Sequence, residues 1–359
     1  MAVTRLNIGG TEKYVLTISK YLKAQGVHVG IATKGGALRA AFQRLGIRIH
    51  LLSRPTISGR THEMSSLIKQ GRYGVVHAHD SDSFRITSAL KKTKRFRLIA
   101  TVHGTYHQIG SIRAIGRSGN KVIAVSPKLV KWAVSRGVPA IRLRLVPNGI
   151  DTNIFRPSRQ KTACRIGLGL PLDAQILVYA GRMGAGKYPI AKSVIIAAAY
   201  IARSNRKFIA VFYGPGRNRV SLAKQAEQIN KRLKRKAIYV LPALSHIERA
   251  YCAADIVAGT GRVALEAMAC ARPVIAVGKA GYCGIVSPHK IETMIRCHFG
   301  DHSSTSPVTT KRLTQDVCTL LAHPHKAKRL GQFGSMLVRR RFSANQVNKV
   351  IKRIYSDKR

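Results

Sequence analysis

The stretch Ile176-Leu177-Val178-Tyr179-Ala180-Gly181-Arg182-Met183-Gly184-Ala185-Gly186-Lys187 indicates the fold class of this chain. Its first five residues form an apolar run of strand length, and the glycine-rich segment that follows carries two cations, Arg182 and Lys187. Apolar runs of this length alternate with amphipathic helical stretches along the chain, which is typical of helices packed on parallel sheets. The sequence therefore predicts an α/β protein.

The predicted strands fall into two groups, separated by a break in the periodicity between Val146 and Pro157, where proline, glycine and asparagine cluster. With roughly 150 residues per domain as a guide, we expect two domains, 1–150 and 151–335, and a basic helical segment, 336–359, that packs back on the body. Met1-Ala2-Val3 is short for the first strand of such a fold, so this strand is a stub or the given start is truncated. The predicted strands are Val27–Ala32, Ile47–Leu52, Val75–Ala78, Leu98–Val102, Val122–Val125, Leu143–Val146, Ile176–Ala180, Phe208–Tyr213, Ile238–Val240, Ile256–Ala258 and Val274–Val277.

The charge of the chain is strongly positive, with 63 lysines and arginines against 14 acidic residues and a formal net charge of +49. We expect an anionic partner, which charge alone leaves open among nucleic acid, lipid headgroups and a phosphorylated substrate. No recognised nucleic-acid motif is present, so no specific nucleic acid is predicted. The longest apolar run, Ser193 to Ala202, is about half of a membrane span, and the cysteines lack disulfide or metal spacing. These features predict a cytoplasmic protein with reduced thiols, and an anionic membrane face is one candidate partner surface.

Polar segments follow several predicted strands of the first domain. Gly9-Gly10-Thr11-Glu12 leads into a helix, whose N–H groups and dipole favour phosphate, although a simple tight turn explains it equally well. His77 and His103 end two buried strands, where side chains reach the ligand edge of an α/β sheet. We expect a structural role for His77, and for His103 a hydrogen bond to a ligand hydroxyl or phosphate oxygen. Asp80-Ser81-Asp82 has a spacing compatible with a cation, but such short patterns are common by chance and no metal is predicted.

Two loops of the second domain carry the strongest signals. Arg182 and Lys187 could stabilise charge that develops on a diphosphate leaving group, with solvated surface charges as the alternative. Ala258 to Ala269 reads as a strand end, the glycine loop Gly259-Thr260-Gly261 and a helix start, so that backbone N–H groups can approach a ligand. Glu266, in the first or second helical turn, could accept hydrogen bonds from a ribose diol or compensate the helix dipole. A second glycine loop, Gly278 to Gly284, follows the next strand.

Together these segments resemble the retaining, nucleotide-sugar-dependent glycosyltransferases of family 4. The resemblance covers nearly the whole chain and depends on the order and spacing of its pieces. They are Gly9-Gly10-Thr11-Glu12, His79-Asp80, Thr101-Val102-His103-Gly104, Ile123-Ala124-Val125-Ser126, Val146-Pro147-Asn148-Gly149-Ile150-Asp151, Gly181-Arg182 with Lys187, and Leu265-Glu266-Ala267-Met268-Ala269 before Pro273-Val274-Ile275-Ala276.

The resemblance implies the GT-B fold, in which two doubly wound Rossmann-like domains face each other across a cleft. It also implies that Arg182 and Lys187 hold the donor diphosphate, that Glu266 holds the ribose, that His103 contacts the donor sugar and that Gly10 lines the phosphate side. Transfer would retain the anomeric configuration without a metal or other cofactor. The nucleotide sugar is the co-substrate, and the acceptor would be a saccharide or a lipid-linked or cell-envelope molecule.

The chain departs from the family pattern at one important position. Ala258 stands eight residues before Glu266, where the family often has a second glutamate in contact with the transferred sugar. The N–H groups of Gly259-Thr260-Gly261 are a possible substitute. The alternative hypotheses are a non-catalytic polyanion-binding or inactive homologue on the same scaffold, and a sugar-nucleotide epimerase or hydrolase of GT-B fold.

Overall fold

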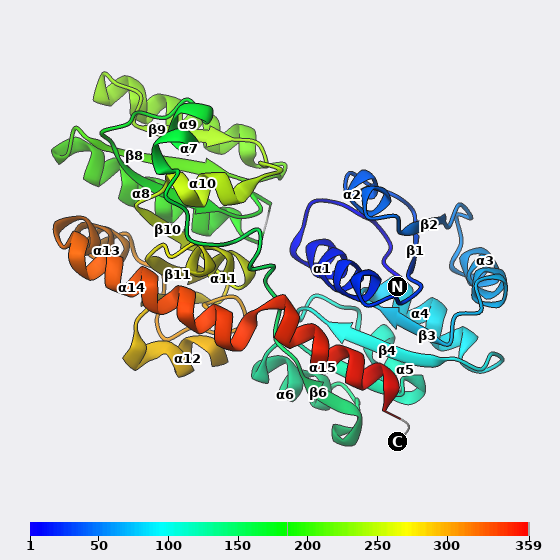
Figure 1. The fold of residues 1–359 in the computed structure, drawn as a ribbon. Coiled ribbons are helices and arrows are strands. Elements are labelled where there is room, and N and C mark those ends of the chain that lie inside the picture. The colour runs from blue at the N-terminus through cyan, green and yellow to red at the C-terminus, as the bar shows by residue number, and fades with distance from the viewer. Residues whose placement is uncertain (185, 358–359) are drawn as a thin grey trace. The chain divides into compact units, whose positions relative to one another are not determined.

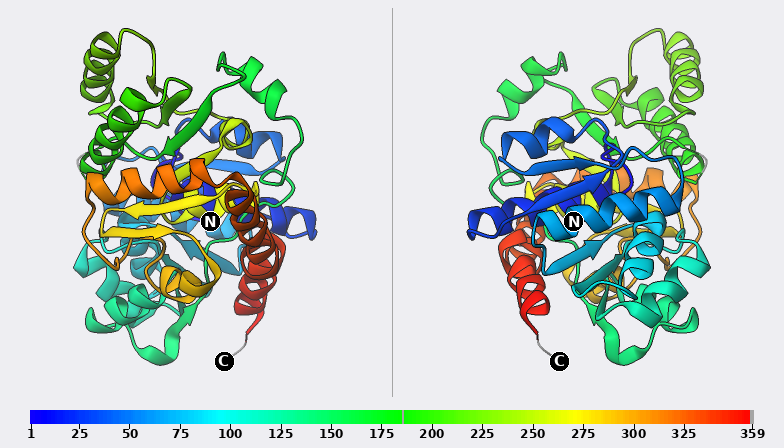
Figure 2. Two further views of the ribbon diagram at one scale, coloured as in Figure 1. Left: turned by 90° about the vertical axis from the view of Figure 1, so that its left-hand side faces the viewer. Right: turned by 90° about the vertical axis from the view of Figure 1, so that its right-hand side faces the viewer.

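The structure is a computed structural model that describes residues 1–184 and 186–357, so Ala185 of the glycine-rich stretch lies outside the described residues. The chain forms two compact units (Figures 1 and 2). Unit 1 comprises Met1–Gly149 and the C-terminal segment from Ser343, and unit 2 comprises Ile150–Phe342. Each unit has its own sheet and its own hydrophobic core.

Unit 1 contains a parallel sheet with the short N-terminal segment at its centre. Ala2 bridges Ala32 on one side and Ala78 on the other, and its N–H donates to the carbonyl of His77 at 2.8 Å. Met1 to Val3 therefore joins the pair β2-β1 to the run β3-β4-β5-β6, in the strand order of a doubly wound sheet. The predicted short first strand lies in the central position of the sheet. The strands are β1 Gly30–Thr33, β2 Arg48–Leu51, β3 Val75–Ala78, β4 Arg97–Val102, β5 Lys121–Ala124 and β6 Leu143–Leu145.

Helices cover the sheet of unit 1, and the last helix of the chain is one of them. Val347 and Ile351 on α15 are buried in the same core cluster as Tyr14 and Ile18 on α1, so the C-terminal helix completes this core (Figure 1). The helices are α1 Gly10–Ala24, α2 Arg39–Arg44, α3 Ile57–Gln70, α4 Ser81–Leu90, α5 Ile109–Ser118, α6 Pro127–Ser135, the short 3-10 turn η1 Ala140–Arg142, and α15 Ala344–Ser356.

Unit 2 has a six-stranded sheet of order β12-β11-β10-β7-β8-β9, parallel except for β12. Residues of β7 alternate between two core clusters, Ile176 and Val178 on one face and Leu177 and Tyr179 on the other, because successive strand side chains point to opposite faces. Both faces are therefore covered by helices. The strands are β7 Gln175–Ala180, β8 Phe208–Tyr213, β9 Ile238–Leu241, β10 Ile256–Gly259, β11 Val274–Gly278 and β12 Gly281–Ile285.

The helices of unit 2 follow its strands along the chain. They are α7 Lys161–Gly167, α8 Tyr188–Ser204, α9 Arg219–Leu233, α10 Ile247–Ala253, α11 Arg262–Ala269, the 3-10 turn η2 Pro288–Lys290, α12 Ile291–Arg296, α13 Thr310–Ala322, α14 Pro324–Leu337 and the π-helical turn η3 Val338–Phe342.

Two local predictions differ from the structure. Gly278 to Gly284 is a hairpin and not a glycine loop, since Tyr282 and Cys283 are buried and β12 pairs with β11. The change from unit 2 back to unit 1 lies between Phe342 and Ser343, and not after residue 335, because α14 continues to Leu337 and Val338 and Phe342 are buried in the core of unit 2. Where the chain first passes from unit 1 to unit 2, Ile150 already belongs to unit 2. Its N–H donates to the carbonyl of Phe342 at 2.8 Å.

Candidate functional site

The glycine-rich loop after β7 is fixed to the loop after β8. The N–H of Gly181 donates to the carbonyl of Tyr213 at 3.0 Å, and the N–H of Met183 donates to the carbonyl of Pro215 at 2.7 Å. A Cβ atom at Gly214 would lie 1.8 Å from the Gly181 carbonyl oxygen, so only glycine fits there. The loop is therefore a rigid platform at the carboxyl edge of the sheet, the edge where open α/β sheets bind ligands.

Cations gather on this platform. Lys187 immediately precedes α8, and its Nζ lies 2.9 Å from Oδ1 of Asp301. Arg182 is exposed. Lys279, between β11 and β12, runs over Gly186, since a Cβ atom there would lie 3.8 Å from its Cδ and Cε. The structure thus brings the predicted Arg182 and Lys187 into one loop and adds Lys279, which sequence reasoning did not single out as a cation of the site.

The loop after β10 requires its glycines for steric reasons. Gly261 has φ +53°, and a Cβ atom on it would lie 3.0 Å from Cε1 of His298. The hydroxyl of Thr260 donates to the carbonyl of Phe299 at 2.7 Å. A Cβ atom at Gly259 would lie 2.4 Å from Cγ1 of Val263. The predicted Gly259-Thr260-Gly261 loop is therefore packed against the segment that contains His298 and Phe299.

Glu266 lies in the second turn of α11 and is only 2% exposed. Nε of Arg262 is 2.7 Å from its Oε1, and the hydroxyl of Tyr251 donates to its Oε2 at 3.4 Å. Burial, and then the Glu266 charge, raise the pKa of Tyr251, which keeps this phenol a donor. A ribose diol could hydrogen-bond to Glu266 only by sharing the carboxylate with these two side chains.

The segment from His298 to His302 belongs to the site and had no sequence signal. His298, Phe299 and Gly300 have φ values of 50°, 55° and 86°, a left-handed conformation that non-glycine residues seldom adopt. Burial opposes ionisation of Asp301, but Lys187 and other neighbours outweigh it and hold its pKa below the usual range. Burial lowers the pKa of His298 to about 3, so this imidazole is neutral.

Within the described residues, the same segment contains a group of side chains that could hold a metal ion. Ligand atoms of His298, Asp301 and His302 lie within 4.8 Å of one another, and the two imidazole rings stack with centroids 4.3 Å apart. Neutral imidazoles and a carboxylate are ligands for divalent transition metals. The ammonium of Lys187 already neutralises Asp301, which weakens the attraction of this set for a cation.

Histidines line the carboxyl edge of β3 and β4 in unit 1. Nε2 of His103 lies 3.4 Å from Nδ1 of His79, and the backbone N–H of His103 donates to Nε2 of His107 at 3.3 Å. His77 is bonded on both sides, to the hydroxyls of Tyr355 at 2.6 Å and Thr101 at 2.7 Å. These contacts agree with the structural role expected of His77. His103 is the half-buried member of this group.

Other predicted residues of unit 1 are placed as follows. Gly10 begins α1, and the space around its Cα is open, because a Cβ atom there would meet nothing within 4 Å. Asp80 caps α4 and accepts from the N–H of Ser83 at 2.9 Å, while Asp82 forms an ion pair with Arg60 at 3.1 Å. Both carboxylates have structural partners, which accounts for them without a metal.

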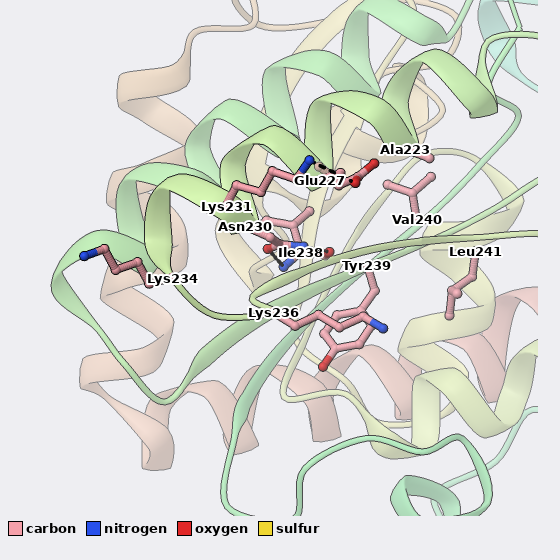
Figure 3. A pocket seen from close by; sticks show the side chains of 11 residues that line it. Ala223, Glu227, Asn230, Lys231, Lys234, Lys236, Ile238, Tyr239, Val240 and Leu241 are labelled. Atoms are coloured by element: carbon pink, nitrogen blue, oxygen red, sulfur yellow. Dashed lines mark hydrogen bonds and ion pairs between the residues drawn. The ribbon is translucent and has the colours of Figure 1, made fainter.

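A groove of about 550 Å³ lies elsewhere in unit 2, between α9 and the edge strand β9 (Figure 3). Lys231 reaches Glu227 across its rim at 3.4 Å, and Asn230 donates to the carbonyl of Ile238 at 2.8 Å (Figure 3). None of its lining residues is a predicted site residue. The predicted site residues of unit 2 lie instead after β7, after β10 and on α11.

Known proteins with similar sequence identify the family of this chain. Residues 8–154 match the model of Glycosyltransferase Family 4, and residues 160–331 match that of Glycosyl transferases group 1. The D-inositol 3-phosphate glycosyltransferase of Thermobispora bispora is 27% identical over 323 residues, covering 76% of this chain and 74% of that protein. A second D-inositol 3-phosphate glycosyltransferase, from Catenulispora acidiphila, is 25% identical over 381 residues, covering 92% and 85%.

Among solved structures, HepE of Anabaena in complex with UDP and glucose superposes with a TM-score of 0.82 at 19% identity, covering 99% of this chain and 98% of that one. The two Rossmann-like units of the chain have the GT-B fold. The chain belongs to the family 4 glycosyltransferases, enzymes that transfer a sugar from a nucleotide-sugar donor.

Proposed function

We propose that this enzyme transfers a hexose from a uridine diphosphate sugar to a hydroxyl of a saccharide or lipid-linked acceptor, with retention of configuration. The observation that carries this proposal is the position of Lys187. It follows the glycine loop after β7, and its Nζ lies 2.9 Å from Oδ1 of Asp301. An ammonium so positioned can meet the charge that develops on a diphosphate as the sugar bond breaks. The UDP complexes of HepE support the choice of base.

The proposed reaction needs little chemistry from the protein itself. The bond between C1 of the sugar and the diphosphate oxygen breaks, a bond from C1 to the acceptor oxygen forms on the same face, and the acceptor proton passes to the departing diphosphate. Arg182 and Lys187 stabilise that diphosphate, and Glu266 accepts from the ribose hydroxyls. In this proposal the donor also contacts the residues that the resemblance implies. These are the backbone N–H groups of the Gly259-Thr260-Gly261 loop, His103 and Gly10.

A panel of nucleotides tests the proposal directly. The melting temperature of the purified enzyme is measured with UDP, GDP, ADP and dTDP and with their glucose esters. We expect selective stabilisation by uridine nucleotides, since a ligand that binds only the folded state raises its stability. Stabilisation by another base would correct the donor, and a flat panel together with salt-sensitive binding of any polyanion would favour the non-catalytic alternative.

Metal independence is part of the proposal. Arg182, Lys187 and Lys279 supply cationic groups where many enzymes use a divalent ion to neutralise a diphosphate. Turnover should be unchanged after dialysis against EDTA and on addition of Mg²⁺ or Mn²⁺. A rate that falls on dialysis and recovers with one metal would contradict it.

The acceptor side of the proposal rests on charge. Among residues 1–184 and 186–357, no helix combines the length and apolar character needed to cross a bilayer. The net charge of +49 would nevertheless attract the protein to an anionic cytoplasmic membrane face that carries lipid-linked acceptors. Vesicles of anionic lipid should co-sediment the protein at low salt, and equal binding to neutral vesicles would count against this localisation.

A further inference from the structure

The end of β10 offers the donor loop of unit 2 no polar side chain at Ala258. This residue is 1% exposed and contributes only a methyl group. It is paired in register with Tyr179 on the neighbouring parallel strand β7, and both belong to the same core cluster. Their side chains therefore share one face of the sheet.

Asp301 brings a carboxylate to this face from a distant part of the chain. Its charge, after burial, is a cause of the raised pKa of the Tyr179 phenol, so the two groups are near each other. Its Oδ2 would lie 3.4 Å from a Cβ atom on Gly261, and its Oδ1 is the partner of Lys187. The carboxylate is thus surrounded by the ends of β7 and β10, and its side chain remains 25% exposed.

The backbone holds Asp301 there at an energetic cost. The left-handed residues His298 and Phe299 directly precede Gly300 and Asp301. The hydroxyl of Thr260 and the N–H of Ala280 donate to the carbonyls of Phe299 and Gly300 at 2.7 Å and 3.0 Å. Strained backbone of this kind persists where the surrounding structure enforces it, and it is concentrated at functional sites.

We propose that Asp301 supplies a carboxylate to the donor site, with Oδ1 orienting the ammonium of Lys187 and Oδ2 accepting hydrogen bonds from hydroxyls of the transferred sugar. The ammonium has three N–H donors, so one bond to Asp301 leaves two for phosphate oxygens. A hydrogen bond to a charged acceptor discriminates strongly between a ligand that has the donor hydroxyl and one that lacks it. This inference rests on the proposed function.

The test separates the sugar from the nucleotide. Dissociation constants of UDP and UDP-glucose are measured by calorimetry for the wild type, Asp301→Asn, Asp301→Ala and the control Asp173→Asn, which changes an exposed aspartate before β7. In both Asp301 variants we expect the preference for UDP-glucose over UDP to fall by about tenfold or more, the effect of one hydrogen bond to a charged group. The control should keep the wild-type preference. Asp301→Asn has the same shape as the native residue and decides the question if Asp301→Ala does not fold.

Three results would overturn the inference, each in a distinct way. An unchanged preference in Asp301→Asn, with normal UDP binding, would remove the sugar-binding role and leave the proposed function intact. Binding of no nucleotide by the wild type would refute both. If Zn²⁺ or Mn²⁺ raised UDP-glucose affinity in the wild type and not in Asp301→Asn or His302→Ala, the carboxylate would be a metal ligand and not a direct acceptor for the sugar.

Discussion

The carboxyl edges of the two sheets differ in charge. In unit 2 the loops present the basic side chains of Arg182, Lys187 and Lys279 and the carboxylate of Asp301. In unit 1 the edge of β3 and β4 is lined by histidines, and burial lowers the pKa of His77, His79 and His107 so that these imidazoles are neutral. Charged side chains thus gather at the carboxyl edge of the sheet of unit 2, and neutral imidazoles gather at the same edge of β3 and β4.

The largest expected effect in unit 2 concerns the buried ion pair between Arg262 and Glu266. Glu266→Ala should lower the free energy of unfolding by about 3 to 5 kcal/mol, because it leaves Arg262 charged and only 10% exposed. Glu227→Ala removes the same kind of i,i+4 pair from an exposed part of α9 and should cost less than about 0.5 kcal/mol. Urea unfolding of both variants measures the difference. Equal losses would mean that Arg262 is solvated once its partner is removed.

Removal of a platform cation should abolish most turnover without unfolding the protein. Lys187→Ala should lower kcat by about 10² to 10³-fold, the usual effect of losing one group that stabilises transition-state charge. Lys192→Ala changes an exposed lysine on α8, the helix that Lys187 precedes; it is the matched control and should behave as wild type. Steady-state kinetics with a saturating donor check this. Wild-type turnover in both single variants, Lys187→Ala and Arg182→Ala, would contradict the assignment of these residues to the diphosphate.

The buried neutral histidines of unit 1 predict acid sensitivity. Burial lowers the pKa of His107 from 6.5 to about 4, so the unfolded chain binds its proton first and stability is lost as the pH falls through that range. At pH 5 the loss from this residue is about 2 kcal/mol relative to pH 8. His107→Gln keeps an acceptor for the N–H of His103 and should flatten the pH dependence of unfolding, whereas the exposed His62→Gln should not. An identical slope in all three proteins would mean that His107 titrates normally.

Substitution of two glycines by alanine should give the smallest expected difference in stability. Gly261→Ala should cost about 1 to 2 kcal/mol, because φ is +53° and the added methyl group meets His298. Gly10→Ala has open space and should leave thermal unfolding unchanged or slightly improved. If Gly10→Ala is stable yet loses turnover, its backbone approaches the donor as predicted. Full activity of Gly10→Ala would mean that this loop is only a tight turn.

The fold was largely predictable because its strands are buried on both faces. Such strands appear as continuous apolar runs, and Val75–Ala78 and Phe208–Tyr213 have the predicted bounds. β12 was missed because Gly281 and Gly284 interrupt its apolar character, and its place comes from pairing with β11. The return of α15 to unit 1 has no local signal, since an amphipathic helix does not specify which surface it will cover.

The site was predictable only where a loop carries its own chemistry. Arg182 and Lys187 stand in a glycine-rich stretch directly after a strand, and a pattern of this kind can be recognised. Asp301 is brought to the site by left-handed residues at His298 and Phe299, which have no sequence signature at non-glycine positions. The contacts of Glu266 with Arg262 and Tyr251 likewise depend on packing that residue types alone do not reveal.

The path of the chain through α15 has a consequence for biosynthesis. Val347, Ile351 and Ile354 of this helix complete the core of unit 1, and Tyr355 bonds the buried His77. When the first 149 residues leave the ribosome, this core still lacks one wall, which is translated only after all of unit 2. Unit 2 is continuous from Ile150 to Phe342, so all of it is made before α15, whereas the core of unit 1 is complete only once α15 has been translated. Until then, nascent unit 1 exposes the apolar side chains that α15 covers, and such exposed apolar surface favours aggregation.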